Sequence, residues 1–199
     1  MAVLLAWAPA GAAPPAYCNG QTIVTESGVH YYPNGQRVVD GFGRQYYPNG
    51  ARIVNDAGDE VRYPDGTRVR TMTGEVLFPN GTPVKSTSGE VRYPSGRRTR
   101  DGGGRCYYDT GVEMTPCQRS VGIRQPLAGG GMVAYELDIV QGTIDLHDVR
   151  FRFPTAGVVT VLRADLVKGE IDRGSISAVC ASGSAPQRER AEYNPRQMR

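Results

Sequence analysis

The chain has 199 residues, enough for one ordinary domain or two small ones. Its formal net charge of +3 excludes a strong overall attraction to nucleic acid or to an anionic membrane. Gly, Pro, Tyr and Arg are abundant, and no stretch keeps the 3.6-residue period of an amphipathic helix for more than about two turns, so we expect an all-β fold.

The N-terminal segment, residues 1–16, is an apolar run followed by small residues and prolines. This pattern resembles the later part of a secretory signal peptide, and Ala8-Pro9-Ala10 or Ala10-Gly11-Ala12 would suit a signal peptidase. The run is too short to cross a bilayer, which takes about 20 apolar residues. We therefore expect a secreted, periplasmic or cell-envelope protein without a transmembrane segment.

Residues 17–117 contain a tandem repeat. A glycine recurs with steps of 15, 15, 16, 15, 15 and 15 residues, and an aromatic residue lies three positions before each glycine. So short a period is typical of repeat architectures, in which each unit buries its apolar face against its neighbours. The repeated glycines are Gly20, Gly35, Gly50, Gly66, Gly81, Gly96 and Gly111.

Each unit contains two turn signals. Tyr-Pro-Asn-Gly places proline, asparagine and glycine where a three-residue hairpin loop needs them, and a second glycine eight residues later marks the return turn. Strands of about four to five residues fit between the turns. The sequence thus predicts an antiparallel meander of about seven hairpins of 15 residues.

Alternation along these strands predicts two different faces. One face is a structural ladder of stacked aromatic residues, accompanied by an aliphatic column from Ile23 and Val38 to Met114. The predicted ladder is Tyr17, Tyr32, Tyr47, Tyr63, Phe78, Tyr93 and Tyr108.

The opposite face is predicted to carry arginine and tyrosine, while most acidic residues lie in turns. Arginines in register could bind sulfated or carboxylated glycans, with tyrosines stacking on the sugar rings. The alternative is that these side chains only cover the sheet and keep its edge soluble. The candidate binding residues are Arg37, Arg52, Arg68, Arg98, Tyr31, Tyr46, Arg62 and Arg92.

The turn motifs YYPNG, YPDGT, FPNGT and YPSG carry a family resemblance that covers about half of the chain. With the following Thr-Arg or Gln-Arg, they resemble the G-box repeats at the C-terminus of centrosomal scaffold proteins of the T-complex family. Those repeats form a free-standing antiparallel sheet that binds a peptide, so the resemblance implies a binding or scaffolding role. The motif is more loosely similar to MORN-type repeats, which have a longer period.

The repeat ends at Cys117, and residues 118–131 are predicted to be a linker because of the QPLAGGG stretch. Residues 132–181 are predicted to form a small β-rich segment of four or five strands, with a short helix over 161–168 as the alternative. About 60 residues make a marginal core, so we expect this segment to pack over the apolar face of the array. The polar tail, residues 182–199, is predicted to be disordered.

Four cysteines, none in a CxxC pair, indicate disulfides rather than zinc or redox chemistry. Three connectivities are possible. Cys106 and Cys117 are the closest in sequence and are favoured as one pair, which leaves Cys18 with Cys180.

Catalytic and metal-binding patterns are weak. His147 lies near Asp138, Asp145 and Asp148, a set that could hold a divalent cation. On a strand, however, Asp145 and His147 point to one side and Asp148 to the other, which favours a solvated strand end. No catalytic serine arrangement or phosphate-binding loop is visible, so we predict no catalytic residue, no metal and no cofactor.

Together these patterns predict an exported, non-enzymatic β-repeat protein with a structural or protein-interaction role at the cell envelope. Its partner would be another protein, a second copy, or an acidic cell-surface glycan, and not nucleic acid. A binding module for acidic glycans is the first alternative. An envelope hydrolase with its site in residues 132–180 is the second.

Overall fold

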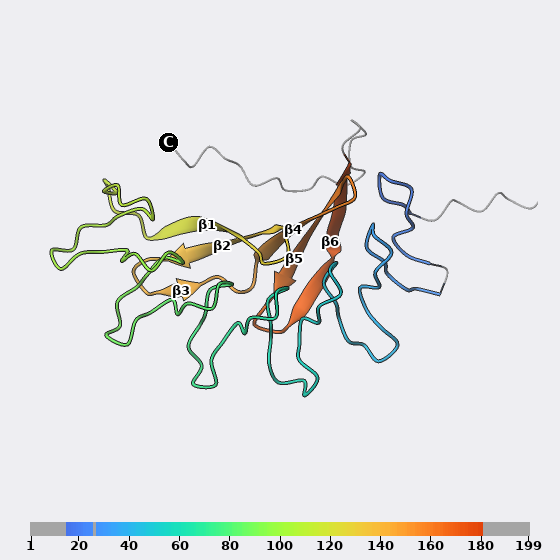
Figure 1. Cartoon of the computed structure of the whole chain (residues 1–199), viewed down its shortest axis with the longest axis horizontal. Helices are drawn as coiled ribbons and strands as arrows, with labels where there is room; N and C mark the ends of the chain where they lie inside the picture. The colour runs from blue at the N-terminus through green and yellow to red at the C-terminus, as the bar shows by residue number, and fades with distance from the viewer. Residues whose placement is uncertain (1–14, 26, 181–199) are drawn as a thin grey trace, which may run out of the picture.

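The computed structural model describes residues 15–25 and 27–180. All regular secondary structure in these ranges is β, with no helix, as the composition predicts (Figure 1). The predicted tail lies outside the described residues, and so do all but the last two residues of the predicted signal peptide.

The C-terminal half forms one antiparallel sheet of six strands with the order β1-β2-β4-β5-β6, and β3 pairs with β2. Alternating burial along β2 and β4 shows that one face of the sheet is covered and the other is exposed. The strands are β1 (Ser120–Pro126), β2 (Met132–Asp138), β3 (Thr143–Ile144), β4 (Val149–Thr155), β5 (Val158–Asp165) and β6 (Glu170–Cys180).

The structure differs from the expected boundaries in two places. The segment 118–131, predicted to be a linker, contains β1, which pairs along its whole length with β2. Gly122 and Pro126 are uncommon inside strands, so this segment does not read as a strand in the sequence. Strand β1 tolerates both residues because it lies at the edge of the sheet. Residues 158–165 form strand β5 rather than the alternative helix, because they pair with β4 on one side and with β6 on the other.

The N-terminal half makes short antiparallel bridges instead of long strands. Tyr31 pairs with Arg37, Val39 with Gln45, and Tyr46 with Arg52, so that each short segment pairs with the one before it and the one after it. Two turns in every 15 residues leave only two or three residues for each pairing segment. The expected strands of four to five residues are therefore too long, while the antiparallel pairing of neighbouring segments is present. We call residues 15–117 the hairpin array.

The hairpin array lies across the covered face of the sheet. In chain order, the Gln45 side chain accepts a hydrogen bond from the Ile171 amide of β6 (2.6 Å), and Tyr47 contacts Phe151 of β4, with ring centroids 5.3 Å apart. Further along, Phe78 stacks on Tyr135 of β2 at 6.1 Å. The array thus runs from the β6 end of the sheet toward the β1 end, as the colour progression in Figure 1 shows.

The two layers share one hydrophobic core. Aromatic residues of the hairpin array and aliphatic residues of the sheet belong to a single buried cluster. Disulfides join Cys18 to Cys180 and Cys106 to Cys117, which is the pairing that the sequence favoured. The first ties the start of the array to the end of β6, so both layers are linked covalently at one end of the molecule.

Candidate binding surface

The Tyr-Pro-Asn-Gly turns are linked to one another along the array. Within a turn, the Asn49 Oδ1 atom accepts the Ala51 amide hydrogen, and Gly50 closes the loop with a φ of 83°. The Asn49 Nδ2 group also donates to the carbonyl of Pro64 in the next turn at 2.9 Å. Asn19, Asn34 and Asn80 make the same contact with the following turn. An amide side chain can both accept and donate in this way, whereas a carboxylate can only accept.

The buried tyrosines connect the hairpins a second time. The Tyr32 phenol donates to the carbonyl of Tyr46, and the Tyr47 phenol donates to the carbonyl of Arg62, at 2.8 and 3.0 Å. Tyr17, Tyr63 and Tyr93 make equivalent bonds to the next hairpin. The aromatic spacing in the sequence locates these rings, but it does not reveal that their hydroxyl groups bond to the neighbouring backbone.

Burial changes the acidity of these phenols. Removal from water penalises the phenolate, so the pKa of Tyr93 rises to about 12 and those of Tyr32, Tyr47 and Tyr63 lie well above the ordinary value of 10. Tyr108 differs from the rest of the predicted ladder because it is 39% exposed. Phe78 is buried but has no hydroxyl group to donate.

Two return turns contain the same polar cluster. Asp40 accepts hydrogen bonds from the Phe42 amide, from the Arg44 amide and side chain, and from the Tyr46 hydroxyl. Asp101 is bonded in the same way to Gly103, Arg105 and Tyr107. Desolvation raises the pKa of both carboxyl groups, but these donors outweigh it, and the pKa of each lies below the ordinary aspartate value.

The predicted arginines and tyrosines lie on the outer face of the hairpin array, away from the sheet. The Arg37 guanidinium lies 5.9 Å from the centre of the Tyr31 ring, and Tyr46 is held by Asp40. Arg52 forms an ion pair with Asp56. All of these side chains are at least partly exposed.

Two glutamates that were not among the predicted site residues partly neutralise the middle of this face. Arg62 and Arg68 bind the two carboxylate oxygens of Glu60, at 2.6 and 2.7 Å. Arg92 and Arg98 share Glu90 in the same way, at 3.1 and 3.0 Å. The signal was present in the sequence: each glutamate precedes an arginine by two residues, so strand alternation puts both on one face. Much of the expected positive surface is therefore internally paired.

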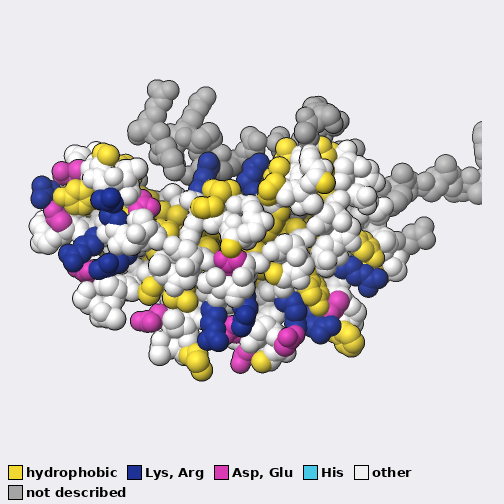
Figure 2. Space-filling view, in the orientation of Figure 1, with side chains coloured by type: hydrophobic (Ala, Val, Ile, Leu, Met, Phe, Trp, Pro, Cys, Tyr) yellow, Lys and Arg dark blue, Asp and Glu magenta, His cyan; other side chains and the backbone are white. Residues whose placement is uncertain are grey.

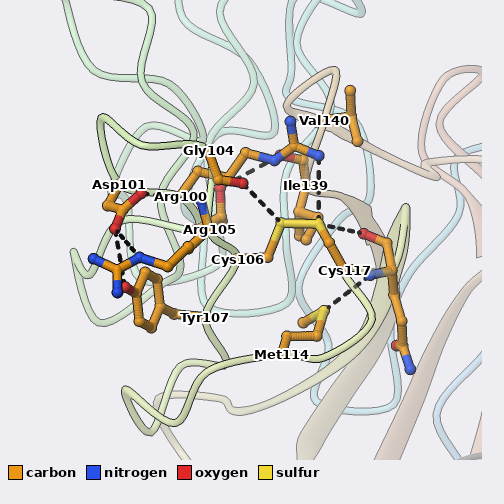
Figure 3. The surroundings of a disulfide bond; sticks show 12 residues. Arg100, Asp101, Gly104, Arg105, Cys106, Tyr107, Met114, Cys117, Ile139 and Val140 are labelled. Atoms are coloured by element: carbon orange, nitrogen blue, oxygen red, sulfur yellow. Dashed lines mark hydrogen bonds and ion pairs between the residues drawn. A yellow bond between two sulfur atoms is a disulfide. The ribbon is translucent and has the colours of Figure 1, made fainter.

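One part of the outer face remains rich in arginine. An open cleft of about 370 Å³ is lined by Arg97, Arg98, Arg100, Asp101, Gly102, Tyr107 and Gly111. Figure 3 shows the Arg100 guanidinium beside the Cys106–Cys117 disulfide, where it donates to the Cys117 Sγ atom at 3.5 Å. Arg97 and Arg100 were not among the predicted binding residues, although the run Arg97-Arg98-Thr99-Arg100 was a visible signal.

The acidic residues near His147, considered above as a cation site, do not converge on a common point. The His147 Nδ1 atom lies 3.1 Å from Asp165 of β5, and Asp145 accepts the backbone amide of His147 instead of facing a common ligand. Desolvation raises the pKa of Asp165, but hydrogen bonds from His147 and from the Lys168 and Val167 amides lower it below the ordinary value. Within 15–25 and 27–180 no three acidic, histidine or cysteine side chains are placed to hold a metal ion.

Comparison with known proteins gives no match: no family model, no curated protein and no solved structure is similar to this chain. The resemblance to G-box and MORN-type repeats therefore depends on the turn motifs alone. In the part of the chain that the structure describes, no helix combines the length and apolar character required to cross a bilayer.

Proposed function

We propose that this chain is an exported, non-enzymatic β-repeat protein with a structural or protein-interaction role at the cell envelope. In this proposal, residues 17–117 are a stack of about seven hairpin units of 15 residues, clamped on one side by the C-terminal sheet. The opposite side is the surface that meets a partner.

The observation that carries the proposal is the direct coupling of each hairpin to the next. Buried phenols and turn asparagines bond to the backbone of the following hairpin, as Tyr47 does to Arg62 and Asn49 to Pro64. Because these bonds are backed by one continuous core, the array behaves as a rigid support. Its outer face is then a preorganised surface, which lowers the entropy lost on binding.

Export is supported by the cysteines. The described cysteines are all in disulfides, and such bonds persist in oxidising compartments outside the cytoplasm. The Cys18–Cys180 bond joins residues 162 positions apart, so it forms correctly only when both layers are assembled.

The side chains with displaced pKa values have structural positions in this fold, which supports a structural rather than a catalytic role. Displaced pKa values are a mark of active sites, but structural bonding also produces them. Here burial in the shared core raises the pKa of the ladder phenols, and the hydrogen bonds that shape the return turns lower the pKa of Asp40 and Asp101. Burial and turn formation account for these shifts without a reacting substrate.

Location is tested by expressing the chain from its own gene and fractionating the cells. We expect the protein in the envelope or secreted fraction, with an intact mass that increases on reduction by two hydrogens for each of the disulfides Cys18–Cys180 and Cys106–Cys117. Reduced protein confined to the cytosol would contradict the proposal.

The interaction role is tested by light scattering of the purified chain over a range of concentrations. If the protein assembles through the sheet edges or apolar patches, self-association persists in the variant R52S/R68S/R98S. Loss of self-association in that variant would instead assign the contact to the outer arginines. A strictly monomeric protein that also binds no envelope component would overturn the structural role.

A further inference from the structure

The arginine-rich cleft is particular to one hairpin. This hairpin carries three arginines close together, Arg97, Arg98 and Arg100. At the positions equivalent to Arg97 and Arg100, every other hairpin carries either two uncharged residues or one cation. The residues equivalent to Arg97 are Gln21, Gln36, Ala51, Thr67, Thr82 and Val112. A function shared by all hairpins would not require this concentration of charge at one end of the array.

Neighbouring elements hold these arginines around the cleft. Alternation places Arg98 and Arg100 on the outer face while Thr99 between them is buried. Arg97 extends over the next turn, where its Nη1 atom would lie 2.8 Å from a Cβ atom added to Gly111. Gly111 therefore leaves the space that the guanidinium occupies. Arg100 rests on the Cys106–Cys117 disulfide (Figure 3).

The cleft has an excess of positive charge after the ion pairs are assigned. Arg98 shares Glu90 with Arg92, and the Asp101 carboxylate is taken by Arg105 and Tyr107. For Arg97 and Arg100, no carboxylate within ion-pair distance exists among the described residues. Figure 2 shows Lys and Arg side chains gathered at this end of the molecule, over the yellow-green hairpins of Figure 1, with acidic side chains beside them.

We propose that the Arg97–Arg100 cleft binds the carboxylate or sulfate groups of an acidic polysaccharide. Two guanidinium groups without acidic partners offer paired N–H donors that match the geometry of carboxylate and sulfate oxygens. The Tyr107 ring beside them offers a negative π face to the polarised C–H groups of a sugar. A volume of about 370 Å³ accommodates one sugar residue, and the open shape lets a chain continue on both sides.

A glycan fits this cleft better than other polyanions. The preference over nucleic acid rests on the location outside the cytoplasm proposed above, where acidic polysaccharides are the abundant polyanions. Single-stranded nucleic acid is held by aromatic rings on which successive bases stack, whereas one tyrosine lines this cleft.

The test is a binding titration of the full, oxidised chain at low ionic strength. The probes are heparin as a sulfated polysaccharide, polygalacturonate as a carboxylated one, polyglutamate as an acidic peptide, and single-stranded DNA. The cleft variant is R97S/R100S. Its matched control is R70S/R173S, which removes the same charge from two exposed arginines elsewhere on the molecule.

We expect one of the two polysaccharides to bind best, and R97S/R100S to weaken that binding by about tenfold or more, while R70S/R173S changes it less than about threefold. The variant R97K/R100K keeps the charge but loses the paired donors, so we expect an intermediate loss. The polysaccharide that binds identifies the anionic group.

Three outcomes would overturn the inference. Equal weakening in both serine variants would mean diffuse attraction to net charge. Tighter binding of polyglutamate or DNA would assign the cleft to a peptide or to nucleic acid. No binding of either polysaccharide would show that the cleft does not bind an acidic polysaccharide. The envelope location and self-association experiments would still test the proposed function separately. Thermal unfolding of each variant shows that the fold is intact.

Discussion

At the scale of single residues, the phenol groups of the buried tyrosines are the most informative feature. A ladder of buried rings would be served equally well by phenylalanine, and Phe78 shows that the array accepts it at one position. The other buried ladder positions keep a hydroxyl group that donates to the next hairpin. The hydroxyl therefore contributes a bond between hairpins that the packing of the ring alone does not provide.

Replacing Tyr47 by Phe tests this bond. The ring contact with Phe151 remains, but the Arg62 carbonyl loses its donor in a partly buried site. We expect the free energy of unfolding to fall by about 1–2 kcal/mol in a denaturant titration. Tyr108→Phe is the matched control, because that side chain is exposed, and it should change stability by less than about 0.5 kcal/mol. Equal effects of the two substitutions would contradict the account.

The raised phenol pKa values predict a stability loss in alkali. The folded pKa of Tyr93 is about 12 and the unfolded value is near 10, so the folded state holds its proton more tightly. This contribution is complete below pH 10 and is lost as the pH rises from 10 through 12. Tyr32, Tyr47 and Tyr63 shift in the same direction.

An absorbance titration at the tyrosinate band, run beside circular dichroism, checks the alkaline prediction. The buried phenols should ionise together with unfolding. Ionisation of all tyrosines near pH 10 in a chain that stays folded would rule out the buried ladder.

At the scale of elements, the turns were the most predictable part of the hairpin array. Pro-Asn-Gly and the second glycine restrict the backbone locally, so their turn conformation does not depend on the rest of the fold. Gly50 and Gly58, one from each kind of turn, both have positive φ. The antiparallel pairing between neighbouring segments follows from those turns.

Other elements could not be obtained from local patterns. Strand β1 contains Gly122, Gln125 and Pro126, and it forms because β2 supplies a partner along its whole edge. The pairing of Glu60 with two arginines was visible as a two-residue spacing, but the shared geometry needs both strands of the hairpin. The approach of Arg97 to Gly111 depends on the order of hairpins in space.

The bond between successive turns can be tested by exchanging amide and carboxylate. Asn49→Asp keeps the acceptor that shapes its own turn but removes the donor to Pro64, so we expect a loss of about 0.5–1.5 kcal/mol in the free energy of unfolding. Asp65 occupies the same position in the next turn and cannot donate. Asp65→Asn should therefore stabilise the protein, as measured by denaturant unfolding. A loss of stability in Asn49→Asp together with a gain in Asp65→Asn supports the bonds between successive turns. A gain of stability from both substitutions would refute them.

At the scale of the whole molecule, one core is shared by a repetitive layer and a non-repetitive sheet. The expectation that the C-terminal segment packs over the apolar face of the array came from its small size, which makes a separate core marginal. The register of that packing, such as Phe78 on Tyr135, is set by side chains far apart in the sequence. No periodicity in either half could give it.

The two disulfides should differ in their effect on stability. In the chain-entropy model, the loop closed by Cys18–Cys180, with a separation of 162 residues, contributes about 5 kcal/mol, and the Cys106–Cys117 loop, with a separation of 11, contributes about 3 kcal/mol. We therefore expect C18S/C180S to lower the midpoint of thermal unfolding more than C106S/C117S does. The reverse order would show that the ends of the two layers are not held together as described.

The central claim is that the hairpin array turns its aromatic ladder toward the sheet and its arginines toward solvent. Hydroxyl-radical footprinting of the intact chain, analysed by peptide mass spectrometry, measures this exposure residue by residue. The account predicts rapid oxidation of Phe42 and Met72, which are 86% and 94% exposed, and strong protection of Tyr32, Tyr47 and Tyr63, which are fully buried. Oxidation of those tyrosines at the rate of the exposed side chains would contradict it.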